Sequence, residues 1–176
     1  MQQPWTVIAA ATLLALGLGG AAHAACDNIP KPVQDALTSE PGWELVRLVH
    51  FFEEEEEFWQ EFHGRQCPGY VAADVDGSGR QTFALSLIKQ AGGRAEHKLI
   101  ALRPGAAGFV KVELPPAQPP SLAMFVVRQG PGKFTDFDTG RKIELATESF
   151  MLGAFASATI LHYFQDGKFQ NLLVAR

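Results

Sequence analysis

Apolar and polar residues alternate with a period of two along most of the chain beyond residue 80, and this pattern predicts β-strands. The clearest case is 110–114, where three apolar residues alternate with Lys111 and Glu113, so one face of this strand should contact solvent. Turn-forming pairs separate the segments, and Asp166 with Gly167 favours a two-residue hairpin turn. The predicted strands cover residues 43–51, 83–88, 99–101, 110–114, 124–127, 143–145, 158–164 and 169–174.

The region before residue 80 has a different pattern. Val33, Ala36 and Leu37 lie on one side of a short predicted helix that ends at the following Pro-Gly pair. Five consecutive glutamates at 53–57 form either a second short helix or an irregular acidic loop, and residues 115–120 predict a stiff proline-rich connection. The whole pattern predicts a mostly β protein: one antiparallel domain of about eight strands, propeller-like or sandwich-like, with one or two short N-terminal helices.

The first two dozen residues have the composition of an export signal. Residues 7–18 are apolar but too few to span a membrane, and the Ala-His-Ala sequence at 22–24 is typical of signal-peptidase cleavage. We therefore expect residues 1–24 to be a signal peptide and 25–176 to be a single β domain without a transmembrane span. The expected location is the periplasm or the outside of the cell.

Cysteine usage agrees with an oxidising compartment. Cys26 and Cys67 are the only cysteines, so we expect them to form a disulfide. Closing a loop of about 40 residues would constrain the unfolded chain by roughly 4 kcal/mol. A lipoprotein acylated at Cys26 is less favoured, because His23 stands where such signals normally have an apolar residue.

The charge balance narrows the range of partners. The net charge is −4, which argues against nucleic-acid binding and is compatible with a basic protein partner. The glutamate run is either a solvated acidic surface or a docking patch, in which Phe52, Phe58 and Trp59 would anchor the partner. The same aromatic residues would also fit a core.

An acidic, glycine-containing loop before the strand at 83–88 predicts a calcium site. Asp74, Asp76, Ser78, the carbonyl of Arg80 and Thr82 stand at alternate positions, so their oxygen atoms can point at one centre. Only two of these side chains are carboxylates, and the following segment is a strand rather than the helix of helix-loop-helix calcium sensors. The alternative is an Asp/Gly-rich turn that holds water rather than metal.

Motifs that suggest catalysis have simpler explanations. Residues 137–140, Phe-Asp-Thr-Gly, resemble an aspartic-protease signature, but Thr139 and Gly140 also favour a hairpin turn. Ser86 and Lys89 have the spacing of penicillin-recognising enzymes, yet on a strand they would point to opposite faces. We therefore expect a protein that is not an enzyme.

Several segments resemble a known group of proteins. Residues 67–69 (Cys-Pro-Gly), the acidic loop at 72–80 and the strand at 83–88 are similar to a segment of secreted bacterial proteins whose calcium loops resemble those of integrin-type propeller repeats. Residues 153–169 resemble the end of those domains. The group includes periplasmic inhibitors of invertebrate-type lysozyme, and immunity proteins that neutralise peptidoglycan hydrolases of rival bacteria. The resemblance implies an antiparallel domain that inserts an exposed loop into a glycosidase cleft.

The resemblance directs attention to one loop. Residues 130–134 should connect two strands, and this loop contains Gly132, Lys133 and Phe134. Lys133 could reach a catalytic carboxylate of the target, because retaining glycosidases depend on two acidic groups. Tyr163 is a further candidate anchor for the partner. The alternative is a plain hairpin loop.

These observations lead to one expected function and two alternatives. We expect a periplasmic binding protein that inhibits a peptidoglycan hydrolase, either a lysozyme-like enzyme or an antibacterial effector, and so acts as an inhibitor or immunity protein. The first alternative is a calcium-stabilised structural or adhesion module of the envelope. The second is a hydrolase whose site is assembled from scattered residues.

Overall fold

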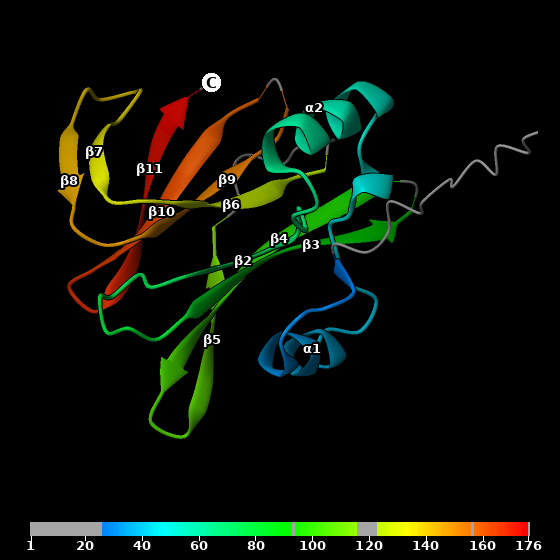
Figure 1. Cartoon of the computed structure of the whole chain (residues 1–176), viewed down its shortest axis with the longest axis horizontal. Coiled ribbons are helices and arrows are strands. Elements are labelled where there is room, and N and C mark those ends of the chain that lie inside the picture. The colour runs from blue at the N-terminus through cyan, green and yellow to red at the C-terminus, as the bar shows by residue number, and fades with distance from the viewer. Residues whose placement is uncertain (1–25, 93, 116–122, 156, 176) are drawn as a thin grey trace, which may run out of the picture.

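The alternating segments build two antiparallel sheets, with a two-stranded ribbon and two helices around them (Figure 1). The computed structural model describes residues 26–92, 94–115, 123–155 and 157–175. Within these residues the chain has eleven strands and two α-helices, so the prediction of a mostly β, antiparallel domain with short N-terminal helices is confirmed. No helix in the described ranges combines the length and apolar composition that a membrane crossing requires.

The first sheet is organised around one long strand. Its strands are β1 (Glu44–Leu45), β2 (Tyr70–Ala73), β3 (Thr82–Ala91), β4 (Arg94–Gly105) and β5 (Gly108–Leu114). β1 and β2 occupy the same edge of β3 in succession, because Leu45 pairs with Leu87 and Tyr70 pairs with Leu85. β4 and β5 extend the sheet from the other edge of β3.

The second sheet has four strands in the order β11-β10-β9-β6. They are β6 (Phe125–Gln129), β9 (Ser149–Gly153), β10 (Thr159–Gln165) and β11 (Lys168–Ala175). β7 (Gly132–Thr135) and β8 (Lys142–Leu145) pair only with each other and form the separate ribbon. The turn between β10 and β11 contains Asp166 and Gly167 with φ of 52° and 78°, as the predicted hairpin requires.

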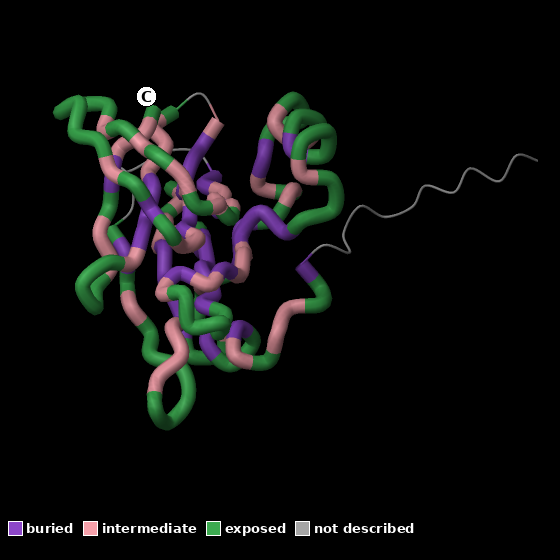
Figure 2. The backbone as a smooth tube through the Cα atoms, turned by 60° about the vertical axis from the view of Figure 1, so that its left-hand side comes forward, coloured by how far each residue is buried: buried purple, intermediate pink, exposed green. Residues whose placement is uncertain are grey.

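Apolar residues from the facing sides of the two sheets make the central core. Ala84, Leu99 and Ala101 from the first sheet pack in one cluster with Phe150 and Leu152 from the second, and each is at most 1% exposed. Figure 2 shows the buried residues concentrated along the strands in the middle of the molecule. Two antiparallel sheets that pack face to face around a shared core form a β-sandwich. Burial of each large apolar side chain in this core contributes about 1.5–3 kcal/mol.

The outer face of the first sheet is covered by α1 (Lys31–Thr38) and the disulfide. Val33 and Ala36 are the buried residues of α1, and they pack in a cluster with strand residues such as Leu85. Cys26 and Cys67 are bonded and belong to the same cluster, so the predicted disulfide is confirmed. The helix begins with a proline in its first turn, where the missing N–H costs nothing.

The outer face of the second sheet is covered by the β7–β8 ribbon. Leu161 and Leu172 are fully buried there, and Phe134 and Ile143 of the ribbon pack against them. The ribbon therefore completes a second small core outside the central one.

One predicted strand is wrong and three strands were not predicted. Of residues 43–51 only Glu44–Leu45 form a strand, and Leu48–His50 instead form a 3-10 turn in which His50 Nδ1 accepts the N–H of Arg47 at 2.9 Å. β2, β7 and β9 are each four or five residues long and are the missed strands. Residues 116–120 of the predicted proline-rich connection lie outside the described residues.

Candidate partner-binding surface

The glutamate run forms a helix, α2 (Glu53–His63), rather than a loop. Its N-terminus is capped by Glu55, whose Oε2 accepts the N–H of Phe52 at 3.0 Å. Acidic residues fill the first turn, where they interact favourably with the positive end of the helix dipole. The helix stops at Gly64, which has a φ of 58° that favours glycine.

One aromatic side chain fixes α2 on the sandwich. Trp59 is 1% exposed and is the only buried residue of the helix. Its Nε1 donates to the carbonyl of Gln66 at 3.0 Å, and its ring lies 5.3 Å from Phe125 and 4.2 Å from His63 between centroids. Burial of Trp59 sets which side of α2 faces the protein.

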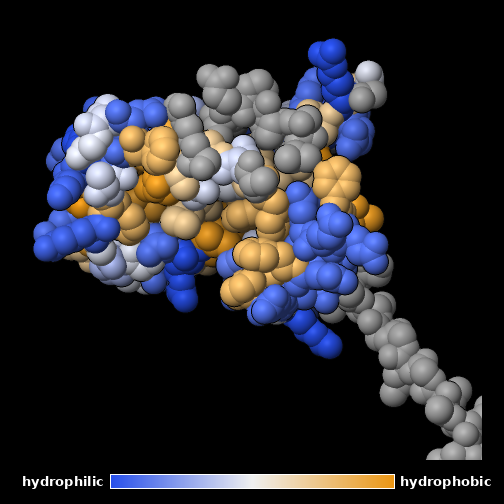
Figure 3. All heavy atoms as spheres, turned by 90° about the horizontal axis from the view of Figure 1, so that it is seen from above, coloured by the Kyte–Doolittle hydropathy of each residue, from blue (hydrophilic) through white to orange (hydrophobic). Residues whose placement is uncertain are grey.

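A second group of apolar side chains is left in solvent. Val49, Phe52, Phe58 and Phe62 are 69%, 64%, 48% and 62% exposed. The rings of Phe58 and Phe62 are 4.5 Å apart between centroids, and Phe58 also contacts Phe155 at 5.6 Å. Figure 3 looks down on this end of the molecule and shows hydrophobic atoms grouped beside hydrophilic ones. Adjacent exposed rings such as those of Phe58 and Phe62 are typical of interaction sites.

The same helix concentrates the negative charge of the molecule. None of its six glutamates forms an ion pair among the residues that the structure describes. The chain has 19 acidic residues and 15 lysines and arginines, so outside α2 the basic residues outnumber the remaining 13 acidic ones. We call Val49, Phe52, Phe58, Phe62 and these glutamates the α2 surface.

The residues predicted to contact a partner lie away from the α2 surface, and three of them are in a strand rather than in the predicted loop. Gly132, Lys133 and Phe134 belong to strand β7 rather than to a connecting loop. The Lys133 side chain is 80% exposed, with Nζ 3.9 Å from Glu144, whereas Phe134 packs into the small core under the ribbon. Tyr163 is 1% exposed, so it is a core residue and offers no surface to a partner.

Four of the five predicted metal ligands lie in the loop between β2 and β3, and the two carboxylates among them already have backbone partners. Asp74 accepts the N–H of Ser78 at 3.0 Å and that of Gly79 at 2.9 Å. Asp76 accepts the same Ser78 N–H at 3.1 Å, and hydrogen bonds from Ser78 hold the pKa of Asp76 below its usual range. Glu148 joins this loop from 74 residues away, with its Oε2 2.8 Å from the N of Asp74. No local sequence signal indicates that contact.

The other two predicted ligands differ in their surroundings. Arg80 donates its N–H to Ser78 Oγ at 3.4 Å. Thr82 begins β3 and is 1% exposed, and its Oγ1 has no hydrogen-bond partner among the described residues. Nowhere in the described ranges do three histidine, cysteine or acidic residues form a group that could hold a metal ion. Calcium binding stays a prediction.

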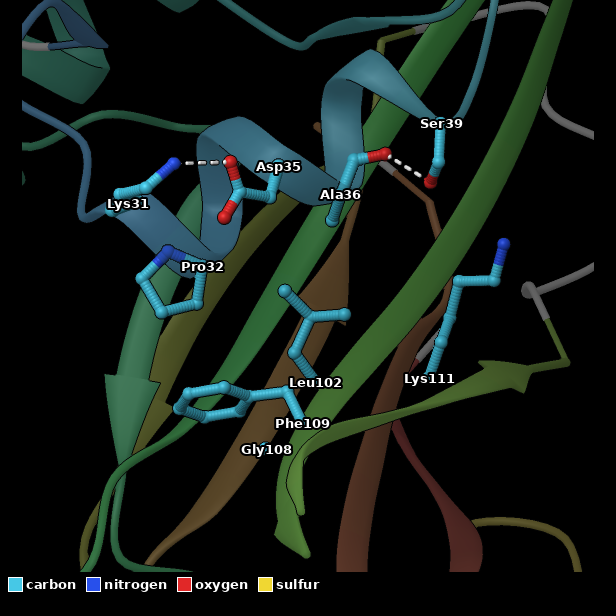
Figure 4. A pocket seen from close by; sticks show the side chains of 9 residues that line it. All are labelled: Lys31, Pro32, Asp35, Ala36, Ser39, Leu102, Gly108, Phe109 and Lys111. Carbon is cyan, nitrogen blue, oxygen red and sulfur yellow. Dashed lines mark hydrogen bonds and ion pairs between the residues drawn. The ribbon is translucent and has the colours of Figure 1, made fainter.

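A cavity of about 530 Å³ lies between α1 and the β4–β5 hairpin (Figure 4). Leu102 contributes to its apolar lining, and Lys31 and Lys111 stand at its sides. Both ammonium groups are already paired: Lys31 Nζ lies 2.7 Å from Asp35, and Lys111 Nζ lies 2.5 Å from Glu40. Both lysines of this cavity therefore already have acidic partners, and we place the candidate site on α2.

The fold and this surface define a β-sandwich with an exposed acidic and aromatic helix. Family models, curated proteins and solved structures were compared with the chain, and none gave a significant match. The resemblance to lysozyme inhibitors and immunity proteins therefore stays a prediction.

Proposed function

We propose that the chain is a non-catalytic binding protein of the cell envelope that inhibits a peptidoglycan hydrolase, with the α2 surface as its docking site. The observation that carries the proposal is the group of exposed phenylalanines on and beside a helix whose six glutamates form no ion pair with a described residue. The resemblance of the Cys-Pro-Gly and acidic-loop segment to lysozyme inhibitors supports the target class. The disulfide is compatible with a location outside the cytoplasm, and the periplasm is the location we propose.

The chemistry of the α2 surface specifies the kind of target. Aromatic side chains that become buried in an interface supply most of its binding energy. The glutamates around them would attract a positively charged surface and raise the association rate, and salt would screen that attraction. The target should therefore be a hydrolase with a basic surface beside its substrate cleft.

The aromatic contribution can be tested with a matched pair of variants. Phe62→Ala removes a ring of the α2 surface, and Phe137→Ala removes an equally exposed ring, 58% against 62%, outside that surface. We expect the protein to slow peptidoglycan clearance by at least one of a panel of lysozyme-type hydrolases that includes an invertebrate-type lysozyme. We expect Phe62→Ala to weaken binding to that hydrolase at least tenfold by calorimetry, and Phe137→Ala to leave it unchanged.

The charge contribution has a separate kinetic signature. Replacement of Glu53, Glu54 and Glu57 with glutamine leaves the capping Glu55 in place. This triple variant should associate several-fold more slowly at low salt, with little change in the dissociation rate. The proposal is overturned if no hydrolase of the panel is inhibited, or if Phe62→Ala and Phe137→Ala bind equally well.

A second candidate function is a calcium-stabilised structural or adhesion module of the envelope. The observation that favours it is the position of the acidic loop. Glu148 accepts the N–H of Asp74 and Thr147 donates to the carbonyl of Val75, and both residues lie in the connection between β8 and β9. This candidate predicts binding to isolated peptidoglycan sacculi that a calcium chelator removes, without inhibition of any hydrolase.

A further inference from the structure

A second cavity, of about 340 Å³, lies between the two sheets, where β4 and β5 approach β10 and β11. Val112 and Leu114 line it from the first sheet, and Phe164 and Phe169 line it from the second. Its volume is at the lower end of the range for small-molecule sites, so it suits a small ligand. No residue of α2 lines it, and it is therefore separate from the α2 surface.

One polar side chain reaches this cavity from the core. His162 lies in β10, is 1% exposed and is part of the cavity lining. Its Nε2 is buried without a hydrogen-bond partner among the described residues, although buried polar groups nearly always have one. Desolvation lowers the pKa of His162 to about 4, so its imidazole is neutral at pH 7 and keeps one N–H to donate. The position would suit an apolar residue unless the imidazole serves a ligand.

One cation of the lining stands beside the aromatic wall. Lys168 also borders the cavity, but it pairs with Gln165, so its side chain lies on the sheet face of Tyr163 rather than on that of His162. The Arg103 guanidinium lies 4.6 Å above the ring of Phe164 and 4.0 Å from the carboxylate of Asp76. Glu113 is the single acidic residue among the described residues of the lining. An anionic group on a ligand would therefore be attracted to this cavity.

We propose that the cavity binds a small amphipathic carboxylate. The apolar body of the ligand lies between the aliphatic wall of Val112 and Leu114 and the aromatic wall of Phe164 and Phe169. Its carboxylate accepts a hydrogen bond from His162 and is attracted by Arg103. This ligand would satisfy the buried imidazole and bring its charge close to Arg103, which an uncharged apolar ligand would not.

The test compares 3-phenylpropionate with 3-phenylpropanol, which differ only in the charged end. We expect the carboxylate to bind at least tenfold more tightly than the alcohol by calorimetry. Its binding should also shift the His162 ring resonances in NMR spectra and raise the pKa of His162, because a nearby anion favours the imidazolium. Arg103→Gln should weaken binding of the carboxylate several-fold, whereas Lys142→Gln, at an exposed lysine of β8, should leave it unchanged.

His162→Phe removes the donor and should abolish the preference for the carboxylate. If that variant does not fold, the His162 resonances of the unaltered protein decide the matter, and their failure to shift on addition of 3-phenylpropionate overturns the proposal. Equal affinity for the carboxylate and the alcohol, or no binding of either at millimolar concentration, also overturns it. Phe62→Ala should bind 3-phenylpropionate normally, so this result is independent of hydrolase inhibition.

Discussion

Glu40 shows how a single residue can join distant parts of this fold. It follows α1, is 9% exposed, and its carboxylate receives hydrogen bonds from Lys98 of β4 and Lys111 of β5, each at 2.5 Å. The hydrogen bond from Lys111, then that from Lys98, holds the pKa of Glu40 below its usual range. Its partners are 58 and 71 residues away, so no local pattern could have identified this cluster.

This cluster makes stability depend on pH in a predictable direction. Because the pKa of Glu40 is lowered by folding from an ordinary value of 4.5, its charge stabilises the folded state above that pH. The stabilisation is lost as the pH falls through the lowered folded value. We expect Glu40→Gln to reduce the free energy of unfolding by about 2 kcal/mol at pH 7, and the difference from the unaltered protein to shrink below pH 4.5.

Urea unfolding at pH 7, 5 and 3 measures this effect. Glu96→Gln is a suitable control, because Glu96 is exposed on β4 and forms no ion pair with a described residue. A difference between Glu40→Gln and the unaltered protein that stays constant down to pH 3 would show that the loss comes from packing rather than charge.

At the scale of elements, the sequence predicts those whose signals are local. The β3–β4, β4–β5 and β10–β11 hairpins were predicted from strand-like segments on either side of a turn pair, and the structure has all three. The β4–β5 turn was expected at Pro104 and Gly105, but both residues belong to β4 and the turn follows them. α1 follows from its apolar side and its proline start. These elements are held by contacts between near neighbours in the chain, so short windows of sequence are sufficient.

The missed elements are held by distant partners. β9 is five residues long and lies between β6 and β10, which supply its hydrogen bonds on both sides. β2 pairs with β3, and β7 pairs only with β8. At residues 43–51 the error was the opposite, because a strand was predicted where most of the segment forms none. Their apolar residues fit a strand, but the chain turns at Leu48–His50. Tertiary pairing overrides propensity in each case.

The candidate site was only partly accessible to sequence reasoning. The glutamate run and its aromatic neighbours indicate an acidic and aromatic segment, but the sequence pattern left helix and loop open, and the segment is a helix capped by Glu55. Neighbouring aromatic residues have opposite environments, since Trp59 is buried and Phe58 is 48% exposed. That division depends on what packs against α2, and Phe125 and Phe155 come from far along the chain.

Gly69 offers a test at the junction of β1, β2 and β3. Its carbonyl accepts the N–H of Ser86 at 2.8 Å, and a Cβ at this position would lie 2.5 Å from the carbonyl oxygen of Val46. Because that contact is with backbone, a side-chain rotation cannot relieve it. We expect Gly69→Ala to lower the free energy of unfolding by about 2–3 kcal/mol in urea titrations. Gly130→Ala, whose Cβ meets no described atom within 4 Å, should change it by less than about 0.5 kcal/mol.

At the scale of the whole molecule, a few polar contacts complement the apolar interface between the sheets. Ser86 Oγ donates to the carbonyl of Met124 at 2.7 Å, and the N–H of Val126 donates to the carbonyl of Pro68 at 2.8 Å. The first bond joins β3 to the residue before β6, and the second joins the segment before β2 to β6 itself. The acidic loop after β2 is joined in the same way to Glu148, the residue before β9. The relative position of the sheets therefore depends on these loops as well as on the core.

The acidic loop gives a prediction about the stability of the whole molecule with and without calcium. Asp74→Ala removes the acceptor of two backbone N–H groups, and we expect it to lower the free energy of unfolding by about 2 kcal/mol in the presence of chelator. Asp74→Asn keeps one acceptor oxygen and should lose less. If calcium binds the folded loop, millimolar calcium should raise the melting temperature of the unaltered protein but not of Asp74→Ala, because a ligand selective for the folded state stabilises it by mass action. A melting temperature that is the same in calcium and in chelator would reject the calcium site, and the loss in Asp74→Ala would then measure the hydrogen-bonded turn alone.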